Sequence, residues 1–214
     1  MQKRKLGNSD LEVSAIGLGV MGMSEFYGAP DERENEATLE RSLELGVSFW
    51  DTADAYGSGH NEALIGRALR GRRDDVVLSV KFGALRDPAD SWTGVDTRPA
   101  AIRNFLAYSL RRLGVDHVDI YRPARVDPTV PIEDVAGTIG DLVKAGYVRH
   151  LGLSEVGADT VRRAHAVHPV ADVQIEYSLV SRGIEDAILP AARELGIGIT
   201  AYGVLSRGLI SGHW

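Results

Sequence analysis

The sequence predicts an α/β domain with parallel strands, because short apolar runs rich in β-branched residues alternate with longer amphipathic stretches. Such alternation of strand and helix is typical of parallel sheets with right-handed crossovers. The chain has 214 residues, of which 44% are hydrophobic, so it is long enough to bury a sizeable core. No linker or low-complexity tract interrupts it, and we expect a single domain over residues 1–214.

Seven segments have the composition of buried strands. They lie near residues 15–19 and at 47–52, 75–81, 117–121, 148–153, 171–176 and 197–202. Two architectures fit this pattern, an open doubly wound sheet and a (β/α)8 TIM barrel. A barrel usually takes about 250 residues, and this sequence ends shortly after the seventh expected strand. In a barrel, therefore, we expect the eighth strand and its flanking helices, the C-terminal part of the domain, to be missing.

Helices are predicted where apolar residues recur three and four positions apart. The clearest amphipathic stretches lie at residues 31–46, 99–114, 132–146 and 184–196. Asp31 resembles an N-cap, Pro99 suits a first helical turn, and Gly114 suits a helix end. The basic segment Lys3–Lys5 is interpreted as the solvated edge of an N-terminal hairpin.

Composition excludes several classes of function. Lys and Arg number 24 against 30 Asp and Glu, and a net charge of −6 argues against non-specific nucleic-acid binding. No apolar run is long enough to span a membrane, and the start lacks the apolar core of a signal peptide, so we expect a cytoplasmic protein. Cysteine is absent, which excludes disulfides and thiolate ligands, and no histidine pair has a third ligand, so no metal site is predicted.

Gly17, Gly19 and Gly22 match the pattern G-x-G-x-x-G, which is weak by itself. A dinucleotide fingerprint needs a helix that starts at the glycines, so that its N-terminus meets the pyrophosphate. Gly28 and Pro30 would break such a helix. We therefore favour a glycine-rich strand end near a ligand over a Rossmann site.

Three polar residues lie at or just after the ends of predicted strands. Asp51 lies at the end of one strand and Tyr56 follows it, and Lys81 ends another, so in a barrel all three lie on the catalytic rim. A tyrosine can act as a general acid when a nearby cation favours its anion, and a carboxylate beside Lys81 would keep that cation in place. In the alternative interpretation, Asp51 caps a helix, Lys81 is solvated and Tyr56 is a loop aromatic. Spacing alone leaves both open.

Several motifs occur together in one order along the chain. They read RKLGNSDLEVSAIGLG from Arg4, FWDTADAYG from Phe49, NEALIG from Asn61, GYVRHLGLS from Gly146 and YGVLSRGLI from Tyr202. With these motifs the chain resembles the aldo-keto reductases over essentially its whole length. The resemblance implies a (β/α)8 TIM barrel with an N-terminal hairpin. It also implies reduction of an aldehyde or ketone to an alcohol with NADP(H) or NAD(H).

The resemblance assigns roles to the rim residues. Tyr56 would be the general acid that protonates the carbonyl oxygen, and Lys81, paired with Asp51, would lower its pKa. The family's fourth residue is a histidine after the fourth strand, and Ala124 stands at that position. A methyl group cannot donate a hydrogen bond, and the loss of one such donor typically costs about 10²–10³ in rate. The neighbouring arginines are candidate substitutes, although for the second we favour a structural role; they are Arg122 and Arg125.

Cofactor residues carry over in part. Ser154 and Gln174 match positions that hold the nicotinamide carboxamide, and Tyr202 matches an aromatic that stacks on the ring. Glu155 stands where the family often has asparagine, and it either accepts from the carboxamide or caps the next helix. The loop after the seventh strand would meet the pyrophosphate with backbone N–H groups. Its matching residues are Leu205, Ser206 and Gly208.

Two other functions stay open. The chain could be a regulatory or sensor barrel that binds nucleotide with little turnover, or an inactive shortened product. Unpaired barrel edges would also favour self-association. Trp92, after the third strand, either lines a substrate pocket or is a hydrophobic anchor.

Overall fold

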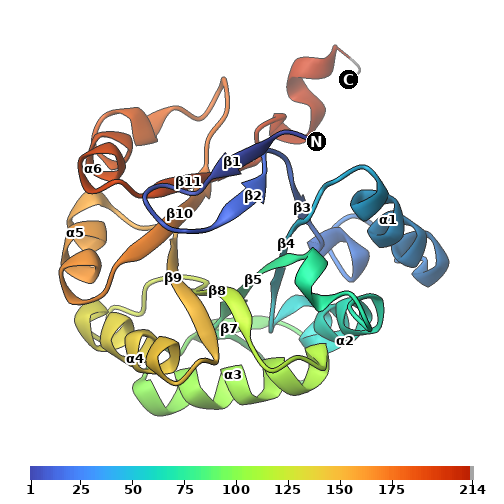
Figure 1. Ribbon diagram of the computed structural model, residues 1–214, viewed down its shortest axis with the longest axis horizontal. Coiled ribbons are helices and arrows are strands. Elements are labelled where there is room, and N and C mark those ends of the chain that lie inside the picture. Colours follow the sequence, from blue (N-terminus) through green and yellow to red (C-terminus); the bar gives the residue numbers. More distant parts are fainter. Residues whose placement is uncertain (213–214) are drawn as a thin grey trace.

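The structure, a computed structural model, describes residues 1–212. Seven parallel strands form one sheet: β3 (Gly17–Gly19), β4 (Phe49–Ala53), β5 (Val77–Phe82), β8 (Val118–Pro123), β9 (Val148–Ser154), β10 (Val170–Glu176) and β11 (Gly198–Tyr202). Their order is β11-β10-β9-β8-β5-β4-β3, and the sheet curls around its own axis with helices outside (Figure 1). The expected parallel strands are confirmed, and the sheet is curled like part of a barrel rather than doubly wound.

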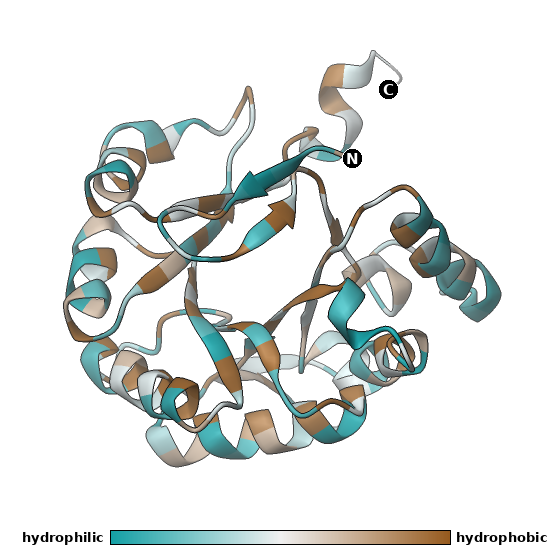
Figure 2. Ribbon diagram, viewed as in Figure 1, coloured by the Kyte–Doolittle hydropathy of each residue, from teal (hydrophilic) through white to brown (hydrophobic). Residues whose placement is uncertain are grey.

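One α-helix lies in each crossover between successive strands of this sheet. In chain order these helices are α1 (Glu32–Glu44), α2 (His60–Ala68), α3 (Pro99–Leu113), α4 (Ile132–Lys144), α5 (Ala158–Val167) and α6 (Ile188–Leu195). Figure 2 shows apolar and polar residues alternating along them, as expected of helices between a core and solvent. The core fills the layer between sheet and helices. Trp50 in this layer is fully buried and donates its indole N–H to Ser42 Oγ at 3.0 Å.

Local sequence explains most helix boundaries. Asp31 accepts hydrogen bonds from the backbone N–H of Arg33 at 2.9 Å and Glu34 at 3.1 Å, so the predicted N-cap is confirmed. Gly114 ends α3 with φ of 66°, a left-handed conformation that costs glycine little.

The helix expected from Ile184 begins later than predicted. A separate 3₁₀ turn, η4, covers Gly183–Glu185, and α6 begins at Ile188. Pro190 explains the difference. It is tolerated in the first turn, where no intrahelical N–H bond is needed, but in a longer helix its ring would clash with the preceding turn.

Two hairpins accompany the sheet. The first pairs β1 (Lys3–Lys5) with β2 (Glu12–Ser14), and β1 is exposed along its length, as predicted. Its apolar residues close the amino ends of the strands in a small cluster that contains Leu6, Leu11, Val13, Phe49 and Ile120.

The second hairpin pairs β6 (Ala84–Arg86) with β7 (Trp92–Val95), and the sequence did not predict it. Trp92, the first residue of β7, is 53% exposed, so it is not a buried anchor. After β3 the chain makes a short 3₁₀ turn, η1 (Met21–Met23), which agrees with the rejection of a Rossmann fingerprint at these glycines. No helix within residues 1–212 is long and apolar enough to cross a membrane.

Candidate active site

The carboxyl ends of β4 and β5 bring three predicted residues together. Asp51 forms a salt bridge with Lys81, and both side chains are largely buried. Tyr56 opens η2 (Tyr56–Gly59), directly after β4, and the Lys81 ammonium lies 5.3 Å from the centre of its ring. The parallel register sets this geometry, because Asp51 and Lys81 point into the barrel from adjacent strands.

The Asp51 carboxylate is held through both of its oxygens. One accepts from Lys81, and the other accepts from the Ser79 hydroxyl at 2.7 Å. Burial opposes the negative charge, but the charges of Lys81 and Arg122 and the two hydrogen bonds outweigh it, so the pKa of Asp51 lies below its usual value. Burial lowers the pKa of Lys81, and the Asp51 charge limits that effect. The site thus keeps an ion pair inside the barrel.

Tyr56 differs from the sequence expectation. Burial raises its pKa above the usual range, and the negative charges of Asp51 and Glu25 raise it further. Arg125 and Arg122 are the cations that act in the other direction. Together these groups give Tyr56 a raised pKa, not the lowered one that the resemblance implied. Tyr56 is therefore protonated at neutral pH, which is the state that a proton donor needs.

The predicted carboxamide residues lie on β9 and β10. Gln174 on β10 accepts from the Lys81 ammonium through Oε1 at 3.1 Å, which joins it directly to the ion pair. Ser154 ends β9 and is buried beside it in the sheet register. Within residues 1–212 no hydrogen bond occupies the Gln174 amide nitrogen or the Ser154 hydroxyl. A donor and a hydroxyl thus remain available for an amide such as the nicotinamide carboxamide.

Tyr202 ends β11 and is 40% exposed at the rim. Its hydroxyl donates to Glu155 Oε1 at 2.7 Å, and that oxygen also accepts from the Glu176 backbone N–H at 3.0 Å. Glu155 thus orients the Tyr202 ring. Burial and the bond to Glu155 raise the pKa of Tyr202 above its usual range.

The loop after β11 turns tightly at the residues that the resemblance places against the pyrophosphate. Leu205 has φ of −89° and is followed by Ser206 at 48°, and Gly208 has φ of 88° within η5 (Ser206–Ser211). The N–H groups of Ser206 and Gly208 donate to the carbonyls of Gly203 and Leu205 at 2.8 and 2.9 Å, so these two donors are occupied by the turns of the loop itself. The Ser206 hydroxyl lies 3.1 Å from Ser178 Oγ, which ties the loop to the end of β10.

Ala124 follows β8 and is buried at the same rim. Its N–H donates to the Phe82 carbonyl at 2.8 Å, so the position lies beside the end of β5 and offers no side-chain donor. Of the two candidate substitutes, Arg122 points into the barrel and is fully buried. Arg125 is exposed and donates to the Ala124 carbonyl at 2.6 Å. Of these two arginines, Arg125 is thus the exposed cation beside Ala124.

A buried charge pair below the site was not foreseen. The Arg122 guanidinium donates to Asp172 Oδ2 at 3.1 Å and to Ser79 Oγ at 3.0 Å, and both charged side chains are fully buried. Thr200 also donates to Asp172. The sequence did carry a signal, since a charge within each of two apolar strands of a barrel needs a partner inside it.

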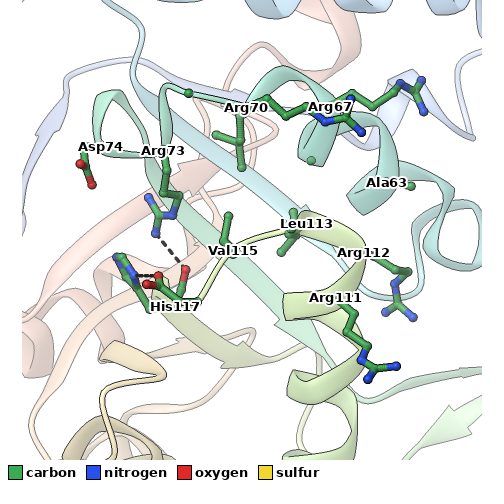
Figure 3. Close-up of a pocket in the computed structure, with 15 residues that line it drawn as sticks. Ala63, Arg67, Arg70, Arg73, Asp74, Arg111, Arg112, Leu113, Val115 and His117 are labelled. Carbon is green, nitrogen blue, oxygen red and sulfur yellow. Dashed lines mark hydrogen bonds and ion pairs between the residues drawn. The ribbon is translucent and has the colours of Figure 1, made fainter.

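A cavity of about 660 Å³ lies at the opposite end of the strands. Figure 3 shows its arginines, which come from the ends of α2 and α3 and the segments after them. Arg73 pairs with Asp119 at 2.7 Å and Arg112 with Glu62 at 2.5 Å. Cations also stabilise helix carboxyl ends, which explains the arginines in the last turns. Ion pairs and helix ends therefore account for several of the arginines that line this cavity. The described residues contain no group of three metal-ligating side chains.

Comparisons with known proteins agree with this geometry. A model of the aldo/keto reductase family matches residues 15–213. A protein from Glycine max named probable aldo-keto reductase 1 is 42% identical over 215 residues, which cover 99% of this chain. The chain spans 62% of the length of that relative.

Solved structures give the same result. An aldo-keto reductase from Bacillus halodurans, in its holo form, has a TM-score of 0.90 and 32% identity, over 100% of this chain and 70% of that one. A glycerol dehydrogenase from Gluconobacter oxydans has a TM-score of 0.91 and 31% identity, over 99% of this chain and 66% of that one. Because the family match covers nearly the whole sequence, the chain belongs to the aldo/keto reductase family.

Proposed function

We propose that this chain reduces an aldehyde or ketone to an alcohol with NADP(H), with Tyr56 as the general acid, in the cytoplasm. The observation that carries the proposal is the Lys81–Asp51 ion pair beside the Tyr56 ring, with the ammonium 5.3 Å from the ring centre. Family membership supports an oxidoreductase that acts on a small carbonyl compound. No feature supports nucleic acid as a partner.

Several residues of this chain would each have a separate role in the reduction. The bound nicotinamide would supply hydride to the carbonyl carbon. Tyr56, protonated at neutral pH, would give its proton to the carbonyl oxygen as that oxygen becomes basic. Lys81 lies where it can stabilise the tyrosinate left behind, and Asp51 holds it there. Arg125 at the mouth is the side chain that could donate to the carbonyl oxygen in place of the family histidine.

The cofactor residues fit a nicotinamide dinucleotide. Ser154 and the Gln174 amide would hold the carboxamide, and Tyr202 would cover the ring. The loop of Leu205 and Ser206 would lie against the pyrophosphate, with Gly208 allowing the tight turn. NADP(H) is our proposal for the cofactor, with NAD(H) as the alternative.

A second candidate function rests on Ala124. With no donor at this buried position, the site would bind nucleotide but turn over poorly, which suits a sensor or regulatory barrel. The sheet edges suggest a partner as well. β3 and β11 end the strand order, and within residues 1–212 neither has a second neighbour. We propose self-association through these edges, to be measured by light scattering after gel filtration. A monomer at all concentrations would contradict it.

The decisive experiment is a titration of the purified chain with NADPH, followed by carbonyl reduction with the Tyr56→Phe variant. We expect saturable binding by both proteins and at least about a hundredfold loss of reduction in the variant. Tyr108→Phe, on the exposed face of α3, is the matched control and keeps full activity. Unchanged reduction by Tyr56→Phe would exclude the assigned acid. Saturable binding without reduction of any carbonyl by the parent chain would favour the sensor function.

A further inference from the structure

We propose that Arg122 is a positioning residue of the candidate active site. Held by Asp172, it orients the Ser79 hydroxyl and, through it, the Asp51 carboxylate that anchors Lys81. The inference rests on the proposed function for its catalytic meaning, but the coupling that it describes is a property of the chain without cofactor.

The hydrogen bonds form a directed chain. Arg122 Nη2 donates to Ser79 Oγ at 3.0 Å, so a lone pair of that oxygen is occupied. The Ser79 proton is then available to Asp51 Oδ1, which lies 2.7 Å away. Lys81 holds the other carboxylate oxygen. Both oxygens of Asp51 are therefore constrained, and one of the two constraints begins at Arg122.

Asp172 keeps the guanidinium in that position. It accepts from Arg122 Nη1 at 3.1 Å, and both side chains have no exposed surface. The same nitrogen lies 3.3 Å from the Leu153 carbonyl. A buried arginine without a counter-charge would be strongly disfavoured, so the Asp172 carboxylate is needed to stabilise this cation inside the barrel.

The backbone of β9 leaves room for the pair. Arg122 comes from β8 and Asp172 from β10, so the pair spans the strand between them. Gly152 on β9 lies opposite Asp172, and a Cβ there would come within 2.8 Å of Asp172 Oδ1 and 3.2 Å of Arg122 Cζ. The absent side chain is what allows Arg122 to reach across. The missing side chain at Gly152 therefore provides the space that the Arg122–Asp172 pair occupies.

Electrostatics agree with the geometry. The charged groups that face Asp51 come from β5 and β8, with the charge of β10 behind them, and they are Lys81, Arg122 and Asp172. Arg122 and the Ser79 hydrogen bond both help to hold the pKa of Asp51 below its usual value. Signs alternate along this row, so the buried charges compensate one another.

The test follows the Asp51 carboxyl by ¹³C NMR during a pH titration of the full chain, with assignment by Asp51→Asn. Three variants break the relay. Ser79→Ala does so at the hydroxyl, and Arg122→Lys and the double substitution Arg122→Met/Asp172→Leu do so at the guanidinium. Ser79→Ala removes the donor, while the double substitution leaves no uncompensated charge. We expect each to raise the pKa of Asp51, the double substitution by about one unit, or about tenfold in proton affinity.

Arg73→Lys is the matched control, because Arg73 also pairs with a largely buried carboxylate, Asp119, at the far end of the strands. It leaves the Asp51 titration unchanged. If the double substitution does not fold, Ser79→Ala and Arg122→Lys decide the question. An Asp51 titration equal to that of the parent chain in every folded variant overturns the proposal.

Activity gives a second readout. In a chain that reduces carbonyls, Ser79→Ala lowers kcat about tenfold and leaves the Kd for NADPH unchanged, because Ser79 acts through Asp51 and not on the cofactor. An equal loss in cofactor binding would indicate a structural role only and would count against positioning. If the parent chain shows no reduction but the titration shifts as expected, the coupling stands and the proposed function fails.

Discussion

Asp54, two residues before Tyr56, should make the protein less stable as the pH rises towards neutrality. It is 8% exposed, and burial, which is the main cause, raises its pKa from 3.8 to about 7. Oδ2 accepts from the Gly83 N–H at 3.2 Å, but Oδ1 has no hydrogen-bond partner among the described residues. The nearby Glu62 carboxyl raises the pKa further. The folded chain therefore holds a proton on Asp54 that the unfolded chain has released.

The sign follows from proton linkage. Between about pH 3.8 and about 7 the folded state binds more protons, so the free energy of unfolding falls as the pH rises. About three pH units separate the two pKa values, and each unit corresponds to about 1.4 kcal/mol, which gives an upper value of about 4 kcal/mol. Asp54→Asn keeps an oxygen for the Gly83 N–H and removes the titration. Between pH 4.5 and pH 8, the free energy of unfolding of the variant should rise by up to this amount relative to that of the parent chain.

Urea unfolding of both proteins at intervals across this range measures the difference. Asp74→Asn is the control, because Asp74 is exposed and within residues 1–212 forms no ion pair. Its stability relative to the parent stays constant with pH. If the difference between Asp54→Asn and the parent is also constant, the carboxyl is not desolvated as argued, and the reasoning is refuted.

Three further outcomes test the site and the barrel. Ala124→His restores a donor at the rim and should raise kcat/KM by about tenfold or more in carbonyl reduction; no increase would mean that the missing donor is not limiting. Gly152→Ala places a Cβ 2.7 Å from Ile120 Cγ2 and should cost about 1–3 kcal/mol in urea unfolding, whereas a neutral result would contradict the close packing. Arg122→Met leaves Asp172 unpaired and should cost about 3–5 kcal/mol; if Arg122→Met/Asp172→Leu costs as much, unpaired charge is not the cause.

Local sequence was sufficient where local chemistry decides the structure. The N-cap at Asp31 and the αL stop at Gly114 could both be predicted, because each depends on a few neighbouring atoms. The predicted start of α6 was wrong because it followed the apolar periodicity from Ile184. Pro190, which is tolerated only near the start of a helix, was visible in the sequence. The hairpin of β6 and β7 was missed because its strands are only three and four residues long, too short to show the alternation that marks a strand.

By itself, the sequence determined the alternation of strands and helices, the composition of the core and the identity of the rim residues Asp51, Tyr56 and Lys81. These follow from hydrophobic periodicity and from short motifs, which are local properties of the chain. The tertiary structure alone decided that Arg122 meets Asp172 and that burial raises the pKa of Tyr56. Those outcomes depend on which strands become neighbours and on how much water their side chains lose, and neither quantity is encoded in spacing along the sequence.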